Sequence, residues 1–81
     1  MQRIYSKEFN KRFQRLDSTT RGRIWDAIQN IPDIPFIKLH GKYVPPLFRI
    51  RVGKYRIIIE MNEHVMNIRD VDARGDVYKN L

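Results

Sequence analysis

Hydrophobic and polar residues alternate in two runs near the middle of the chain, 47–52 and 55–60, which are separated by Gly53 and Lys54. Successive side chains of a β-strand point to opposite faces, so this alternation predicts two strands, each with a hydrophobic and a polar face. Glycine at the first position of a two-residue loop accepts the positive φ that a type II′ turn requires. The two runs therefore predict an antiparallel hairpin.

The same alternation divides the side chains of the hairpin between its two faces. The core face is expected to hold the aromatic and aliphatic positions Phe48, Ile50, Val52, Tyr55, Ile57 and Ile59. The opposite face carries Arg49, Arg51 and Arg56, with no carboxylate between residues 47 and 56. Three guanidinium groups on one face repel one another, and bound phosphates would relieve that repulsion. We interpret the three as a phosphate-binding set, in preference to solvent-facing charges that discourage edge pairing.

Apolar residues recur at helical spacing in the first third of the chain. A short strand is expected over residues 2–5, and Ser6 has the side chain of a helix N-cap. Phe9, Phe13 and Leu16 then form one apolar stripe, at spacings of four and three residues. The opposite face of this helix carries the basic residues Lys7, Lys11, Arg12 and Arg15. We interpret that basic face as a solvated surface.

A second amphipathic helix is expected to follow directly. Residues 17–19 are polar and are expected to end the first helix and cap the second. The core face of the second helix holds the aliphatic residues Ile24, Ala27, Ile28 and Ile31. Trp25 lies beside this stripe and is also expected in the core. Because the connection is short and polar, the two helices predict an αα-hairpin.

All four prolines lie between residues 32 and 46, and they predict an irregular loop there. Its apolar residues are expected to anchor the loop to the core: Ile34, Phe36, Ile37 and Leu39. After the hairpin, a tight turn and a third strand over residues 65–71 are expected. Met66 and Ile68 would face the core, while Asn67 and Arg69 would share the face of the three arginines.

At 81 residues, the chain is long enough for one domain with a modest core. We predict a single α+β domain over residues 1–81, with the N-terminal helical hairpin packed on one face of a small, mainly antiparallel, twisted β-sheet. Sixteen Lys and Arg residues against nine Asp and Glu residues give a formal net charge of +7. This charge favours a polyanionic partner, with nucleic acid as the first candidate.

Residues that the chain lacks narrow the chemistry further. There is no cysteine and there are only two histidines, far apart in sequence, so we expect no disulfide, no metal site and no other cofactor. The first residues hold no apolar run, so we expect neither a signal peptide nor a membrane span, and we expect a cytoplasmic protein. No Ser-His-Asp set, glycine-rich phosphate loop or paired-carboxylate site stands out. Phosphodiester cleavage through the RNA 2′-hydroxyl fits, because the substrate supplies the nucleophile.

The sequence resembles toxins of the RelE/ParE superfamily from toxin–antitoxin pairs. The resemblance rests on Lys38-Leu39-His40-Gly41, on the block from Phe48 to Ile58, and on the ending Arg74-Gly75-Asp76-Val77-Tyr78. It implies a RelE-like fold and, for RelE-type members, an endoribonuclease (an mRNA interferase). Such a toxin enters the A site of the 30S ribosomal subunit, cuts mRNA through 2′-hydroxyl attack and so inhibits translation. It also implies a RelB-like antitoxin as partner.

The resemblance assigns roles to individual residues of this chain. It implies a catalytic set formed by Arg49, Arg51, Arg56, Arg74 and Tyr78. Basic residues around this set are expected to contact RNA or the ribosome: Lys38, Lys42, Lys54, Arg69 and Lys79. Ala73 and Gly75 stand where relatives often have a histidine and a second arginine. An arginine cannot act as a general base, so Tyr78 is the first choice for that role; the alternative is that the arginines and the ribosome supply nearly all the catalysis.

Two other functions are also compatible with the sequence. A ParE-like toxin shares the fold but inhibits DNA gyrase and has no nuclease activity, whereas a plain nucleic-acid-binding module would read its target with the hairpin as a β-ribbon. The presence of Arg56 together with Tyr78 favours the nuclease. Leu47, Ile58 and Val65 are expected to form apolar margins of the arginine face, suited to an acidic amphipathic helix of an antitoxin.

Overall fold

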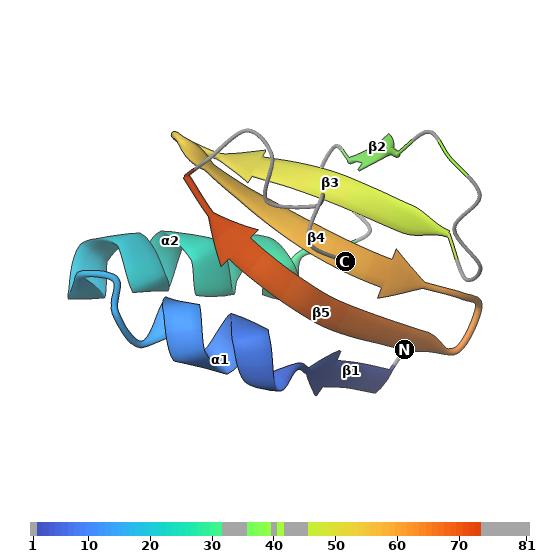
Figure 1. Cartoon of the computed structure of the whole chain (residues 1–81), viewed down its shortest axis with the longest axis horizontal. Coiled ribbons are helices and arrows are strands. Elements are labelled where there is room, and N and C mark those ends of the chain that lie inside the picture. Colours follow the sequence, from blue (N-terminus) through green and yellow to red (C-terminus); the bar gives the residue numbers. More distant parts are fainter. Residues whose placement is uncertain (1, 32–35, 40, 42–45, 74–81) are drawn as a thin grey trace.

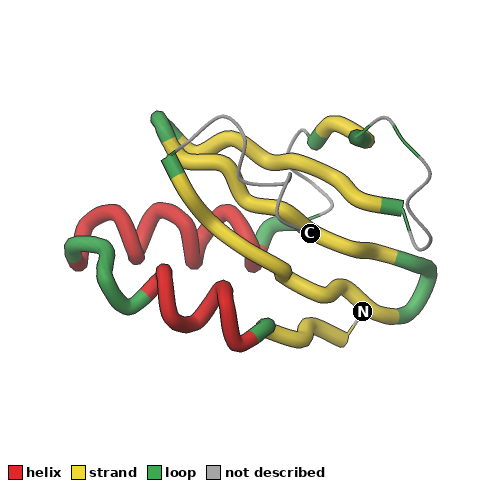
Figure 2. The backbone as a smooth tube through the Cα atoms, in the orientation of Figure 1, coloured by secondary structure: helices red, strands yellow, loops and turns green. Residues whose placement is uncertain are grey.

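The computed structural model of the chain describes residues 2–31, 36–39, 41 and 46–73. Within these ranges the elements are β1 (Gln2–Tyr5), α1 (Lys7–Phe13), α2 (Ser18–Gln29), β2 (Ile37–Lys38), β3 (Leu47–Val52), β4 (Tyr55–Met61) and β5 (Val65–Asp72). The strands form one sheet in the order β1-β5-β4-β3-β2, in which only β1 and β5 are parallel (Figures 1 and 2). The predicted α+β fold with a mainly antiparallel sheet is confirmed.

Both helices begin at the predicted caps. The Ser6 hydroxyl accepts a hydrogen bond from the Phe9 amide at 3.1 Å, and an Asp17 carboxylate oxygen accepts one from the Thr20 amide at 3.0 Å. The first helix ends at Phe13, so Leu16 lies beyond it, although Leu16 still packs against the core. No helix in the described ranges is long and apolar enough to cross a membrane.

The core lies between the helices and one face of the sheet. It consists of Phe9, Ile24, Ile28, Ile31, Ile50, Ile57, Ile59, Met66, Ile68 and Val71. The predicted apolar stripes of both helices contribute to it, as do the predicted inward positions of the three long strands. Phe48 is an exception, because it is half-buried and its ring packs edge-on against Phe36 instead. Trp25 is an exception, because its side chain is 45% exposed and stacks on Tyr5 with ring centroids 5.6 Å apart. The prediction that Trp25 is a core residue was therefore wrong. Its ring lies at the edge of the core, on the partly buried Tyr5.

The β3–β4 hairpin has the predicted register and turn. Val52 pairs with Tyr55 across the two-residue loop, and Gly53 has a φ of 60°. A type I′ turn would need positive φ at Lys54 as well, but no described residue other than glycine has a positive φ. The turn is therefore of type II′. It places Arg51 directly opposite Arg56.

The proline-rich stretch differs from its prediction as a loop anchored to the core. Ile37 and Lys38 form the short edge strand β2, which pairs with Arg49 and Phe48 of β3. Phe36 and Ile37 are 36% and 55% exposed. Among the described residues that were expected to anchor this loop, Leu39 alone packs against a buried cluster, that of Leu47 and Ile58. Ile34 lies outside the described residues.

Candidate functional site

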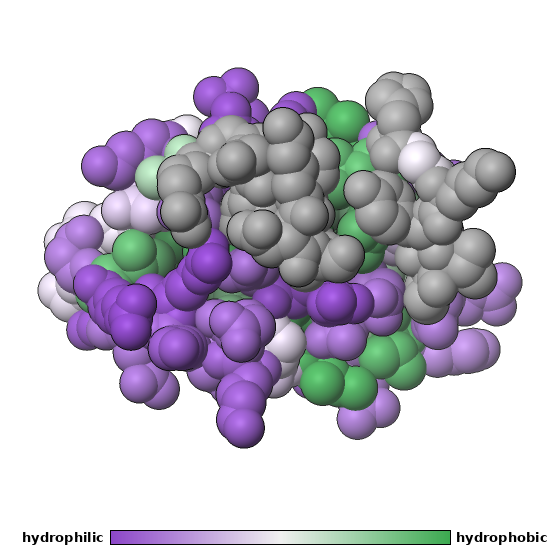
Figure 3. All heavy atoms as spheres, viewed as in Figure 1, coloured by the Kyte–Doolittle hydropathy of each residue, from purple (hydrophilic) through white to green (hydrophobic). Residues whose placement is uncertain are grey.

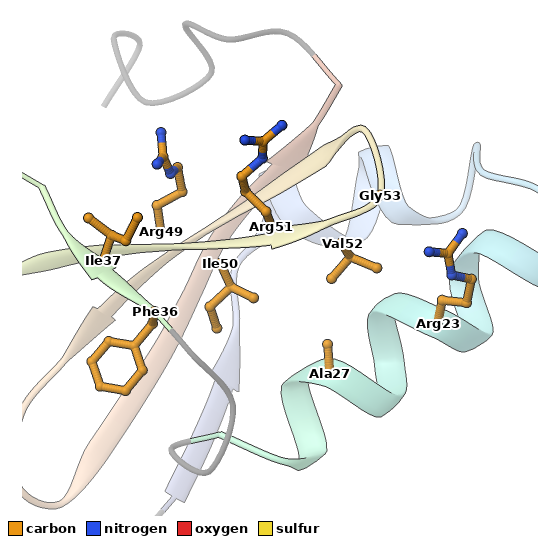
Figure 4. A pocket seen from close by; sticks show the side chains of 9 residues that line it. All are labelled: Arg23, Ala27, Phe36, Ile37, Arg49, Ile50, Arg51, Val52 and Gly53. Atoms are coloured by element: carbon orange, nitrogen blue, oxygen red, sulfur yellow. The ribbon is translucent and has the colours of Figure 1, made fainter.

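The three arginines of the hairpin lie together on the sheet face opposite the helices. Figure 4 shows Arg49 and Arg51 pointing away from α2, whereas Ile50 and Val52 point towards it. Arg51 is paired with Arg56 in the antiparallel register, and such opposing residues have Cβ atoms about 4.5–5.5 Å apart. The predicted convergence of these three residues is therefore present, and we call them the arginine face.

Two members of the arginine face hold donors that the described part of the chain does not satisfy. Arg51 is exposed, but Arg49 and Arg56 are half-buried, and the Nε atoms of both are buried without a hydrogen-bond partner among the described residues. A buried donor left without an acceptor costs about 1–3 kcal/mol, more when it is charged. A phosphate oxygen is an acceptor of the right charge for such groups. The gathering of three guanidinium groups on one face thus favours anion binding over a merely solvated surface.

One further contact fixes Arg56. Its Nη1 atom donates to the backbone carbonyl of Ala73 at 3.4 Å. Asp72, the preceding residue, pairs with Arg56 in the β4–β5 register, so a carboxylate lies at the β5 side of the arginine face. The hairpin sequence alone gave no sign of this carboxylate, because Asp72 is 16 positions after Arg56.

The prediction that α1 presents a fully solvated basic face was wrong for Arg12. Its guanidinium forms an ion pair with the Asp72 carboxylate, and its Nε lies 3.5 Å from Asp70 Oδ1. Asp70 is only 4% exposed, and its Oδ1 accepts the Val71 amide at 2.8 Å. Burial raises the pKa of the Asp70 carboxyl, an effect that the Val71 amide and the Arg12 charge oppose.

The predicted RNA-binding residues do not all lie on the arginine face. Lys38 pairs with Phe48, so the alternation of β2 directs it to the face opposite the arginines, although it is exposed. Lys54 is exposed at the hairpin turn, with Nζ 5.6 Å from the centroid of the Tyr55 ring. Arg69 pairs with Glu60 at 2.6 Å, which offsets its charge. Lys54 is thus the best placed of these three to contact a polyanion.

Four predicted site residues fall outside the described part of the chain. They are the catalytic candidates Arg74 and Tyr78 and the RNA-binding candidates Lys42 and Lys79. Their assignments stay predictions from the sequence. Ala73, the last described residue before them, is held by its contact with Arg56.

Apolar residues near the arginine face are buried more than expected. Leu47 is 3% exposed and Ile58 is fully buried, and Leu39 packs against them. The prediction that Leu47 and Ile58 form exposed margins was therefore wrong.

The described surface in the space-filling view is mostly hydrophilic, with smaller hydrophobic areas (Figure 3).

A groove of about 510 Å³ runs between β3 and α2, next to the arginine face (Figure 4). It is lined by Arg23, Ala27, Phe36, Ile37, Arg49, Ile50, Arg51, Val52 and Gly53. Arg23 reaches the hairpin turn, since a Cβ atom on Gly53 would lie 3.4 Å from its Nη2. No pattern along the chain singles out Arg23, because only the packing of α2 under the turn brings it there.

No protein-family model matches the sequence, and no curated protein matches it. The fold, however, is similar to solved structures. An archaeal RelE–RelB complex from Pyrococcus horikoshii OT3 matches with a TM-score of 0.72 and 28% identity, over 91% of this chain and 94% of that one. A RelB–RelE antitoxin–toxin complex from Methanococcus jannaschii matches with the same score and identity, over 96% and 98%. The isolated E. coli RelE toxin matches in fold, with a TM-score of 0.74 and 22% identity over 98% and 92%.

Proposed function

We propose that this chain of the RelE toxin superfamily is the toxin of a type II toxin–antitoxin pair. Two of the matching structures are complexes of a RelE toxin with a RelB antitoxin, which supports a RelB-like protein as the partner of this chain. We place the pair in the cytoplasm, where the translating ribosome is found.

The reaction we propose is ribosome-dependent cleavage of mRNA in the A site. The observation that carries this proposal is the arginine face, in which β3 and β4 bring three guanidinium groups to one side of the sheet. In the reaction, the 2′-oxygen of the RNA attacks the adjacent phosphorus, and the 5′-oxygen of the next nucleotide leaves and takes up a proton from water. The products are a 2′,3′-cyclic phosphate and a 5′-hydroxyl. Negative charge builds up on the phosphate oxygens in the transition state, so cations fixed beside them accelerate the step.

Each arginine has a distinct role in this proposal. Arg49 and Arg51, on β3, bind the scissile phosphate, and Arg56, on β4, stabilises the charge that develops on it. Arg74 adds a further cation, and Tyr78 takes the proton from the 2′-hydroxyl. Guanidinium groups remain protonated and cannot take that proton themselves. The ribosome orders the mRNA for in-line attack, which is the costly part of the reaction for a small protein.

The antitoxin, in this proposal, silences the toxin by covering its basic surface. A net charge of +7 favours an antitoxin segment that carries acidic residues and folds on binding. The two proteins should therefore co-purify when their genes are expressed together. A neighbouring gene whose small product does not bind this chain would remove the support for an antitoxin.

Mapping RNA ends after expression of the protein in cells tests the function. The proposal predicts new 5′-hydroxyl ends inside translated regions, in phase with the reading frame. DNA-damage signalling without such ends would indicate a gyrase inhibitor instead. Cells that grow normally and show no new ends would indicate a plain nucleic-acid-binding module.

A further inference from the structure

A chain of contacts links α1 to Arg56 through the end of β5. Arg12 of α1 forms an ion pair with the Asp72 carboxylate. The other oxygen of that carboxylate, Oδ1, accepts the backbone amide of Ala73 at 2.7 Å. The carbonyl of Ala73 in turn accepts a hydrogen bond of 3.4 Å from the Arg56 guanidinium. The first and last of these contacts join groups that are far apart in sequence. The middle contact fixes the backbone where β5 ends.

We propose that Arg12 and Asp72 are positioning residues, which hold the Ala73 carbonyl where it orients the Arg56 guanidinium. The inference rests on the proposed function, because the reaction gives the orientation of Arg56 its importance. It adds to that function a requirement for α1, an element on the helical side of the molecule. Neither Arg12 nor Asp72 touches the RNA in this proposal.

The weakest link makes Arg56 sensitive to Asp72. A hydrogen bond of 3.4 Å is near the limit of useful length, so a small shift of residue 73 breaks it. Asp72 limits such a shift, because one of its carboxylate oxygens holds the Ala73 amide and the other is held by Arg12. The side chain of Asp72 is 19% exposed and that of Arg12 is 27% exposed, so both are restrained by their surroundings.

Asp70 strengthens the anchor at Arg12. The same guanidinium approaches both carboxylates, Asp70 through Nε at 3.5 Å and Asp72 through Nη1. One planar guanidinium with several donors in a fixed geometry can bridge two carboxylates, whereas an ammonium group cannot reproduce that arrangement. The two aspartates flank Val71, which is 2% exposed and belongs to the core. The end of β5 is therefore fixed both by packing and by charge.

Single-turnover cleavage at saturating toxin separates positioning from folding. Asp72→Ala should slow cleavage on ribosomes by about tenfold, whereas Asp72→Asn, which keeps an oxygen for the Ala73 amide, should retain most of the rate. In an Arg56→Ala background, Asp72→Ala should have no further effect, because the residue it positions is gone. A loss of equal size in both backgrounds would overturn the proposal, since it would mean that Asp72 acts independently of Arg56.

A second measurement on the free protein does not depend on cleavage. The NMR signal of the Arg56 Nε–H group should indicate an ordered side chain in the wild type, and Asp72→Ala or Arg12→Met should disorder it. Arg3→Met is the matched control, because Arg3 is also tied to backbone carbonyls, those of Ile28, Gln29 and Ile31. Its loss should leave the Arg56 signal unchanged.

The two measurements fail in different ways. If the wild type does not cut mRNA on ribosomes, the proposed function is wrong, while the Arg56 signal still decides whether Arg12 and Asp72 orient that side chain. If the wild type cuts mRNA and the Arg56 signal is unaffected by Asp72→Ala and Arg12→Met, the positioning proposal is wrong and the proposed function stands.

Discussion

Arg56 is the residue on which the proposed chemistry depends most. It faces Arg51 across the hairpin, its buried Nε has no partner in the described ranges, and its Nη1 donates to the Ala73 carbonyl. Its side chain lies outside the helix-covered core, so removing it should have little effect on folding. Its loss from the reaction should matter far more, because no other described cation occupies the same place.

We expect Arg56→Ala to lower the free energy of unfolding by no more than about 0.5 kcal/mol. Loss of its charge from the transition state should cost roughly 3–4 kcal/mol, a hundredfold or more in the rate of single-turnover cleavage. Ile50→Ala is the contrasting control, since a cavity in the core should cost about 2–5 kcal/mol of stability. Cleavage by Arg56→Ala at the wild-type rate would remove this arginine from the catalytic set.

Asp70 gives a prediction about pH. Burial raises its pKa above the ordinary value of 3.8, so the folded protein binds this proton more tightly than the unfolded chain does. Its contribution to stability should therefore fall as the pH rises from about 4 through the raised pKa, and then stay constant. The neutral variant Asp70→Asn lacks this dependence. Urea unfolding across this pH range should show Asp70→Asn gaining stability relative to the wild type as the pH rises.

The opposite trend would reverse the interpretation of this site. If the wild type gained stability relative to Asp70→Asn with rising pH, the folded pKa of Asp70 would be depressed. The Arg12 charge and the Val71 amide would then outweigh the cost of burying the carboxylate.

At the scale of single elements, Ser6 joins β1, α1 and β5. Its hydroxyl accepts a hydrogen bond from the Phe9 amide and donates one of 2.5 Å to the Arg69 carbonyl. Ser6→Ala should lower the free energy of unfolding by about 1–2 kcal/mol, because a cap is lost and a carbonyl loses its donor. Ser18→Ala is the control at the start of α2, where Asp17 supplies the cap, and it should change stability by no more than about 0.5 kcal/mol. Equal losses in thermal unfolding would mean that the Ser6 hydroxyl has no special role.

Elements that depend on local signals could be predicted from the sequence. The alternation of β3 and β4, the glycine of their turn and the caps Ser6 and Asp17 act within a few residues, and all were predicted. The strand β2 could not be foreseen, because the pairing of Ile37 and Lys38 depends on β3 being beside them. The same holds for the parallel pairing of β1 with β5, which joins segments more than 60 positions apart.

The candidate site likewise divides into residues that local patterns identify and residues that only contacts between distant segments identify. Arg49, Arg51 and Arg56 could be selected because a period of two residues and a two-residue turn place them on one face. The ion pair of Arg12 with Asp72 could not, because it depends on how α1 packs against β5. Lys38 was selected by charge alone, and the strand register directs it to the other face.

At the scale of the whole molecule, the two helices and the arginine face lie on opposite sides of the sheet. The helices bury one face, and the other carries the arginine face beside the small buried cluster of Leu47 and Ile58, against which Leu39 packs (Figure 1). A protein of this size with a net charge of +7 can bind phosphates but has little structure with which to order a flexible RNA strand. We therefore propose that the ribosome orders the RNA substrate.

The most direct test of this account compares one mRNA in two states, free in solution and positioned on purified ribosomes with a codon in the A site. Each is mixed with excess wild-type protein, and the single-turnover rate of cleavage is measured. We predict rapid cleavage on the ribosome, with a 5′-hydroxyl product, and a rate at least about a hundredfold lower for the free RNA. Equal cleavage of free and ribosome-bound RNA, or no cleavage of either, would contradict the account.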